Sequence, residues 1–141
     1  AMAVQALQVV PRTPATAAAV ERAADWLVSV QGSDGGLSDN DGRPVNTNST
    51  GLAAQTLRAT GRTGAADRAR TWVEARQLLC GAGPGHRGAF AYTASDGGVD
   101  ARATPQAVLA LGLAIDIAVG GGINRWNRPP PAWSGPPILL T

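Results

Sequence analysis

Apolar residues recur every three or four positions in four stretches of this chain, and polar or glycine-rich segments separate these stretches. Such spacing places apolar side chains on one face of a helix. The pattern predicts helices at residues 14–31, 48–60, 64–79 and 103–119. The expected fold is therefore all-α.

Oxygen-bearing side chains stand where these helices are expected to begin. Thr13-Pro14 combines an N-cap with proline at the first helical position, and Thr104-Pro105 repeats that pair. Asn48 or Ser49 can cap the second helix, and Thr63 can cap the third.

The predicted helices divide the chain into three parts. Residues 1–12 form an apolar N-terminal arm, either the end of a helix or a short extended segment. Residues 13–119 form the helical domain. Residues 120–141 are rich in glycine, proline and tryptophan, which favours an extended or disordered tail. A proline-rich ligand for a partner protein is the alternative interpretation of this tail.

The fourth predicted helix is apolar on nearly every side, which is typical of a buried helix. A chain of this size leaves part of such a surface uncovered, and large exposed apolar patches usually mark interfaces. We expect a two-fold homodimer through this helix or through residues 1–12. The alternative is that the arm and the tail fold back over both flanks of the same chain.

Charge and composition exclude several classes of partner. All 12 basic residues are arginine, and the net charge of +2 is too small to indicate nucleic acid binding. No apolar run is long enough to predict a membrane span. Cys80 is the only cysteine, so an internal disulfide is impossible. No signal peptide is recognisable at Ala1-Met2, but one could have been removed, so the localisation stays open.

An internal repeat relates the two halves of the helical domain. The pattern Ala-x-x-Trp-x-x-x-x-Gln occurs at residues 23–31 and again at 69–77. The second and fourth helices also align, from Thr50 and from Thr104 onward. A period of about 50 residues with two helices per unit predicts stacked helical hairpins.

The repeated residues have structural roles in this interpretation. Trp26 and Trp72 are expected to pack between neighbouring helices, with ligand stacking as the alternative. Gln31 and Gln77 are expected to join each helix end to the next loop through amide hydrogen bonds.

These features resemble the prenyltransferase and squalene-oxidase repeat family, most closely its bacterial surface proteins, over about residues 14–119. The resemblance rests on the Trp and Gln positions and on three groups of segments: the loops Ser33-Asp34-Gly35-Gly36 and Ser95-Asp96-Gly97-Gly98, the helix start Ser49-Thr50-Gly51-Leu52-Ala53-Ala54-Gln55, and Gly88-Ala89-Phe90-Ala91-Tyr92 leading to Arg102-Ala103-Thr104-Pro105-Gln106. It implies a partial α/α toroid of about two helical hairpins. In such a ring the outer helices carry Trp and Gln, and the inner helices line a cavity. The chain departs from the family pattern at Leu37, which replaces the usual aromatic residue.

Catalytic chemistry has little support among the residues. The family fold serves terpene cyclases, prenyltransferase subunits, cobalamin carriers and thioester domains, so the fold does not decide the function. The segment Asp39-Asn40-Asp41-Gly42 lacks the third adjacent carboxylate of a protonating cyclase and suits a turn. Cys80 and His86 are each the only residue of their type, too few for a zinc site. We therefore predict no catalytic residue, metal or cofactor.

Five polar residues near the starts of the expected inner helices are candidates for ligand contact, with helix capping as the alternative: Asn48, Thr50, Tyr92, Arg102 and Gln106. The leading hypothesis is a non-enzymatic binding or interaction module of a repeat-containing protein. The family resemblance alone favours a secreted or cell-surface location. Its partners would be a second copy or neighbouring repeats of a longer chain. The alternative is a fragment or subunit of a terpene-cyclase or prenyltransferase-like enzyme that acts on isoprenoids.

Overall fold

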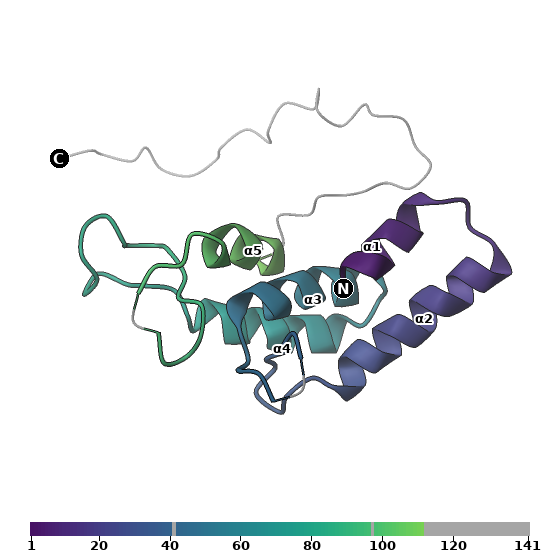
Figure 1. The fold of residues 1–141 in the computed structure, drawn as a ribbon, viewed down its shortest axis with the longest axis horizontal. Coiled ribbons are helices and arrows are strands. Elements are labelled where there is room, and N and C mark those ends of the chain that lie inside the picture. Colours follow the sequence, from purple (N-terminus) through teal and green to yellow (C-terminus); the bar gives the residue numbers. More distant parts are fainter. Residues whose placement is uncertain (41, 97, 112–141) are drawn as a thin grey trace, which may run out of the picture.

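A computed structural model describes residues 1–40, 42–96 and 98–111, and the regular structure of these residues is helical. Five helices follow one another along the chain (Figure 1): α1 (Met2–Val9), α2 (Pro14–Ser29), α3 (Thr47–Ala59), α4 (Thr63–Glu74) and α5 (Ala103–Ala110). The prediction of an all-α fold is confirmed for this part of the chain. Residues 112–119 of the predicted fourth helix, and the predicted tail, lie outside the described residues.

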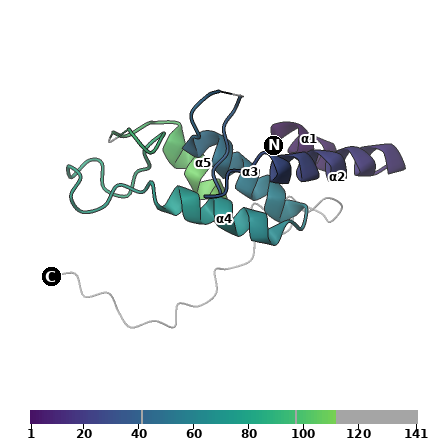
Figure 2. The ribbon, with the colours of Figure 1, turned by 90° about the horizontal axis from the view of Figure 1, so that it is seen from below.

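Helix α3 lies at the centre and packs along both α4 and α5. Helices α1 and α2 form a pair at one end of the molecule, and the long segment between α4 and α5 lies at the other end (Figures 1 and 2). The core that α3 organises is mostly small residues: Leu27, Leu37, Ala53, Ala54, Leu57, Ala65, Ala66, Ala69, Trp72, Val73, Phe90, Ala103, Ala107 and Ala110. Because alanine fills little space, the helix backbones approach closely.

Two helices approach closely at Gly51 of α3. A Cβ atom at this position would overlap the main-chain carbonyl oxygen of Gln106 in α5. Glycine therefore serves here to let two helix backbones touch, at a cost in intrinsic helix propensity.

The N-terminal arm is helical, which settles the choice left open by the sequence. Helix α1 buries Val4 and joins α3 through a hydrogen bond of 2.8 Å from Gln5 Nε2 to Gln55 Oε1. Helix α2 begins as predicted, because Thr13 Oγ1 accepts a hydrogen bond from the Thr16 main chain at 3.1 Å. The Thr16 hydroxyl accepts the reciprocal bond from the Thr13 main chain, so the two threonines form a capping box.

Helix α3 begins earlier than predicted. Asn46 is its N-cap, and Asn46 Oδ1 accepts a hydrogen bond of 2.8 Å from the Ser49 main chain. The prediction that Asn48 or Ser49 caps this helix is wrong, because both lie inside its first turn. The reason is tertiary: the main-chain N–H of Thr47 donates to the Tyr92 carbonyl at 2.8 Å, which fixes where the helix starts.

Two further predicted caps are also wrong. Thr63 is the first residue of α4, after the cap position Arg62, and makes no capping bond. Helix α5 begins at Ala103, the first residue of the predicted span, but Thr104-Pro105 lies inside the helix and does not cap it. Asp100 Oδ1 instead accepts a hydrogen bond of 2.9 Å from the Ala103 main chain. The Thr104 hydroxyl is engaged elsewhere, as described below.

Helix α4 ends at Glu74, five residues before the predicted end at residue 79. The chain leaves the helix because its main chain pairs with the segment before α5. Leu78 donates to the Ala89 carbonyl at 2.8 Å, and Ala91 donates to the Arg76 carbonyl at 3.1 Å. These bonds flank an isolated antiparallel bridge and compete with a continued helical ladder.

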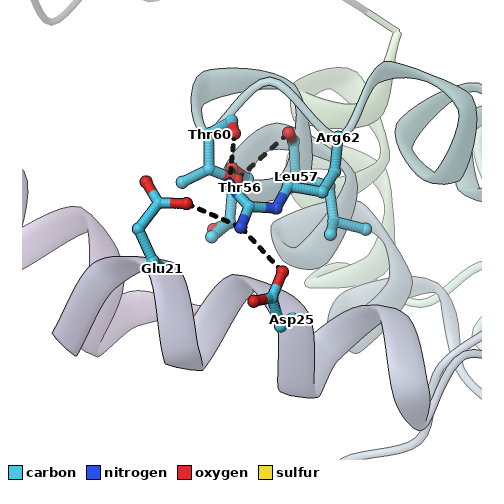
Figure 3. A network of polar contacts seen from close by, with 6 residues as sticks. All are labelled: Glu21, Asp25, Thr56, Leu57, Thr60 and Arg62. Carbon is cyan, nitrogen blue, oxygen red and sulfur yellow. Dashed lines mark hydrogen bonds and ion pairs between the residues drawn. The ribbon is translucent and has the colours of Figure 1, made fainter. Parts of the chain in front are cut away.

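Arg62 joins α2 to the turn between α3 and α4 (Figure 3). Its guanidinium donates to Asp25 and to Glu21, each at 2.7 Å, and to the Thr60 carbonyl at 2.6 Å. The hydrogen bonds to Asp25 and Glu21 raise the pKa of Arg62 above its ordinary value. This network holds the exposed helix α2 in place where its apolar contacts are few.

Candidate functional site

The loop after α2 is bound tightly to α4. Gln31 Nε2 donates to the Gly35 carbonyl within the loop and to the Ala65 carbonyl of α4, each at 2.9 Å. Gln31 Oε1 in turn accepts a hydrogen bond from Arg68 Nη2 at 2.9 Å. The predicted role of Gln31, to join its helix end to the next loop, is confirmed, and the same amide also reaches α4.

Trp72 completes this contact. The side chain is 4% exposed, and its Nε1 donates to Asp34 Oδ2 at 2.9 Å. The other carboxylate oxygen of Asp34 accepts a hydrogen bond from the Gly36 main chain at 3.1 Å. A Cβ atom at Gly36 would lie 2.6 Å from Trp72 Nε1, so only glycine admits the indole. Trp72 is therefore buried, as a packing role requires, but the contacts described here are with a loop and not between two neighbouring helices.

We call this contact the repeat junction. It consists of Gln31, Asp34, Gly35 and Gly36 on the loop, and of Ala65, Arg68 and Trp72 on α4. Each of its polar atoms named above has a hydrogen-bond partner, and the contact is partly buried, since Trp72 is enclosed while Asp34 and Arg68 are exposed.

The second half of the domain repeats the loop side of the junction. Gln77 Nε2 donates to the Gly88 carbonyl at 3.3 Å, as Gln31 does to Gly35. Both glycines have positive φ, 95° at Gly35 and 81° at Gly88, a conformation that favours glycine. The two bonds span different lengths of chain, 4 residues in the first case and 11 in the second.

A second pair of hydrogen bonds confirms this correspondence. Leu37 donates its main-chain N–H to Thr50 Oγ1 at 2.9 Å, and Phe90 donates its main-chain N–H to Thr104 Oγ1 at 3.0 Å. The sequence alignment of Thr50 with Thr104 is therefore also a structural one. Phe90 takes the place that Leu37 has in the first half.

The predicted match between the two Asp-Gly-Gly loops does not hold in space. The structural counterpart of Gly35-Gly36 is Gly88-Ala89, which lies before Asp96 in the chain. Asp96 instead accepts a hydrogen bond of 2.7 Å from the Thr93 hydroxyl, within its own turn. The longer connection after Gln77 hides this correspondence from an ungapped comparison of the loops.

Trp26 occupies the position in α2 that Trp72 occupies in α4, yet it is 61% exposed. The prediction that Trp26 packs between neighbouring helices is wrong for the described part of the chain. The reason is that Trp72 packs on the loop between α2 and α3, whereas Trp26 is left uncovered by the described loops.

Of the five predicted ligand contacts, one lines the hollow that the described residues form on the second loop. Thr50 is buried and engaged with Leu37, and Arg102 is exposed at the start of α5. Asn48 Oδ1 and Gln106 Oε1 are both buried without a hydrogen-bond partner among the described residues. Tyr92 alone lines the hollow described next.

A hollow of about 410 Å³ lies on the second loop, lined by Tyr92, Ser95, Asp96, Gly98, Val99 and Asp100. It offers carboxylate, hydroxyl and phenol groups at the surface. Asp100 also caps α5, so part of the lining is committed to the fold.

Metal-binding groups do not assemble in the part of the chain that the structure describes. Within the described residues there is no group of three or more His, Cys, Asp or Glu side chains close enough together to hold a metal ion. Cys80 and His86 are both exposed. Among the same residues, no helix has the length and apolar character needed to cross a membrane.

Comparisons of the chain with protein-family models, with curated proteins and with solved structures gave no match.

Proposed function

We propose that this chain is a non-enzymatic interaction module of the prenyltransferase and squalene-oxidase repeat kind, whose α/α-toroid units stack side by side. The observation that carries the proposal is the repeat junction. Trp72 is buried in this contact, whereas Trp26, at the same position of the sequence pattern in α2, is exposed. A chain that joins its own halves through this contact has the means to join another helical repeat in the same way.

The exposed side of α2 supports an interaction role. Large aromatic side chains are enriched at the centres of protein interfaces. Trp26 is such a residue on a helix that buries only Ala24 and Leu27. On this proposal the module belongs to a longer assembly of repeats, and the resemblance to surface proteins favours a secreted or cell-surface setting.

Site-specific photo-crosslinking tests the interaction. A photoreactive phenylalanine in place of Trp26 is expected to capture a protein built of helical repeats. The matched control is the same residue at Met2, which is 70% exposed and lies on α1, outside both α2 and the second loop. Equal capture at both positions would contradict the proposal. It would also be contradicted if every protein captured at residue 26 lacked helical repeats.

A turnover assay tests the rival function, an isoprenoid-processing enzyme. The chain is incubated with geranylgeranyl diphosphate or with squalene, with and without Mg²⁺ and Zn²⁺. We expect no product above a buffer control. Product formation that is lost on Asp39→Asn would overturn the interaction proposal in favour of catalysis.

A further inference from the structure

Helix α2 carries the same docking residues as α4. Ala19, Arg22 and Trp26 have the spacing of Ala65, Arg68 and Trp72, the three residues with which α4 meets the first loop. Arg22 and Trp26 are both exposed. Helix α2 therefore carries the three residues that form the helix side of a repeat junction, and its Arg22 and Trp26 are not covered by the described loops.

The opposite end of the domain presents the loop side. Gln77 is exposed, and a Cβ atom at Gly88 would meet nothing within 4 Å. At the equivalent Gly35 a Cβ atom would overlap the main chain of Arg68 in α4. The surface that α4 covers on the first loop is thus open on the second loop.

Two residue differences distinguish the second loop, whose surface is uncovered, from the first loop, which α4 covers. Arg87 stands where the first loop has Asp34, and Ala89 stands where it has Gly36. The Ala89 methyl group keeps an indole from lying as deep as Trp72 does. A guanidinium offers a different contact, a stack on the indole face, which Arg76 already makes over Trp72 at 3.9 Å.

The helix side differs in a complementary way. The residue before Trp72 is the uncharged Thr71, whereas the residue before Trp26 is Asp25, whose side chain is 70% exposed. Asp25 already pairs with Arg62 at 2.7 Å, and its carboxylate stays exposed beside Trp26. Arg87 on an incoming loop would therefore meet an indole face next to a carboxylate that it would share with Arg62.

From these observations we infer that the Ala19, Arg22 and Trp26 face of α2 docks onto the Gln77, Arg87 and Gly88 surface of a second copy of this chain. The inference rests on the proposed function and names its partner. The contact is head to tail, since two different surfaces meet, and it can therefore continue from copy to copy.

Light scattering and sedimentation velocity on the purified chain test this inference. The weight-average mass should rise from the 14.3 kDa monomer with concentration and pass the dimer without a plateau. Trp26→Ala and Arg87→Glu should each weaken the association by roughly tenfold or more. Both residues are exposed, so circular dichroism and the melting temperature should stay unchanged and report that the variants fold.

Mixing the two variants gives the sharper result. A Trp26→Ala chain keeps its loop surface, and an Arg87→Glu chain keeps its helix surface. An equimolar mixture should therefore form a one-to-one dimer and nothing larger, although neither variant associates alone. A two-fold interface would give a plateau at the dimer, and the mixture would show no such recovery.

Three results would overturn the inference. The first is a wild-type chain that stays monomeric up to about 1 mM, because its dissociation constant would then be far weaker than that of a specific complex. The other two are association that Trp26→Ala leaves unchanged, and a two-fold dimer. The crosslinking experiment separates these failures from failure of the proposed function. Capture by residue 26 of a different helical-repeat protein, with none of this chain, would retain the interaction role and reject self-association.

Discussion

Trp72 and Trp26 occupy the same position of one sequence pattern, and their surroundings differ completely. Trp72 is 4% exposed and donates its indole N–H to Asp34, whereas Trp26 is 61% exposed. The difference lies in what covers each helix. A loop of the first repeat covers α4, and no described loop covers the same face of α2. The same residue in the same sequence pattern is therefore buried or exposed according to the segment that lies against its helix.

The largest expected effect is on stability when the closed junction loses its tryptophan. Trp72→Ala should lower the free energy of unfolding by about 3–5 kcal/mol, the range for truncating a large buried aromatic side chain. Trp26→Ala is the matched control and should change it by less than about 0.5 kcal/mol, as exposed substitutions do. Chemical denaturation followed by circular dichroism measures both. Equal losses would show that Trp26 is also packed.

Two helical glycines give the next comparison. Gly51→Ala should destabilise the protein by about 1–3 kcal/mol, because the new methyl group overlaps the Gln106 carbonyl and pushes α3 from α5. Gly64→Ala in α4 meets only the tip of Arg68, at 4.0 Å, and should stabilise by about 0.5–1 kcal/mol through helix propensity. Thermal denaturation of both variants tests the close approach. A stabilising Gly51→Ala would show that α3 and α5 are farther apart.

The two equivalent threonines should act alike. Thr50→Val removes the acceptor for the buried Leu37 main chain and should cost about 1.5 kcal/mol. Thr104→Val removes the same bond to Phe90 and should cost a similar amount. Urea denaturation of the single variants and of the wild type measures both. A loss at only one threonine would contradict the structural equivalence of the two loops.

The smallest expected effect belongs to Arg62. Its partners Glu21 and Asp25 have side chains 54% and 70% exposed, so solvent and salt screen the attraction. Arg62→Met should cost less than about 1 kcal/mol in dilute buffer, and the difference should shrink as salt is added. Unfolding at low and high sodium chloride gives the comparison. A large loss that salt does not change would mean that Arg62 acts through packing.

The sequence predicted the helices well and several of their ends poorly. The capping box at Thr13 depends on neighbouring residues, so local sequence was sufficient there. The segment from Asn46 to Thr50 contains five residues in a row that can cap a helix, and local sequence could not choose among them. The choice of Asn46 depends on a hydrogen bond from Thr47 to Tyr92, a contact between distant parts of the chain.

The candidate site was predictable only in part, for a similar reason. The repeated Trp and Gln identified Gln31 and Trp72 as junction residues. The sequence match of Asp34 with Asp96 was misleading. Because the second loop is longer, the residue equivalent to Gly35 is Gly88, which lies before Asp96. A gapped comparison anchored on Thr50 and Thr104 would have found it.

The hydrogen bond between Trp72 and Asp34 joins α4 to the loop after α2, and a double-mutant cycle measures its strength. Trp72→Phe keeps an aromatic ring and removes the indole N–H, and Asp34→Ala removes its acceptor. The free energies of unfolding of the two single variants and the double variant should reveal a coupling of about 0.5–1.5 kcal/mol in favour of the pair. Additive effects, equal within about 0.3 kcal/mol, would show that Asp34 and Trp72 do not hold the repeats together.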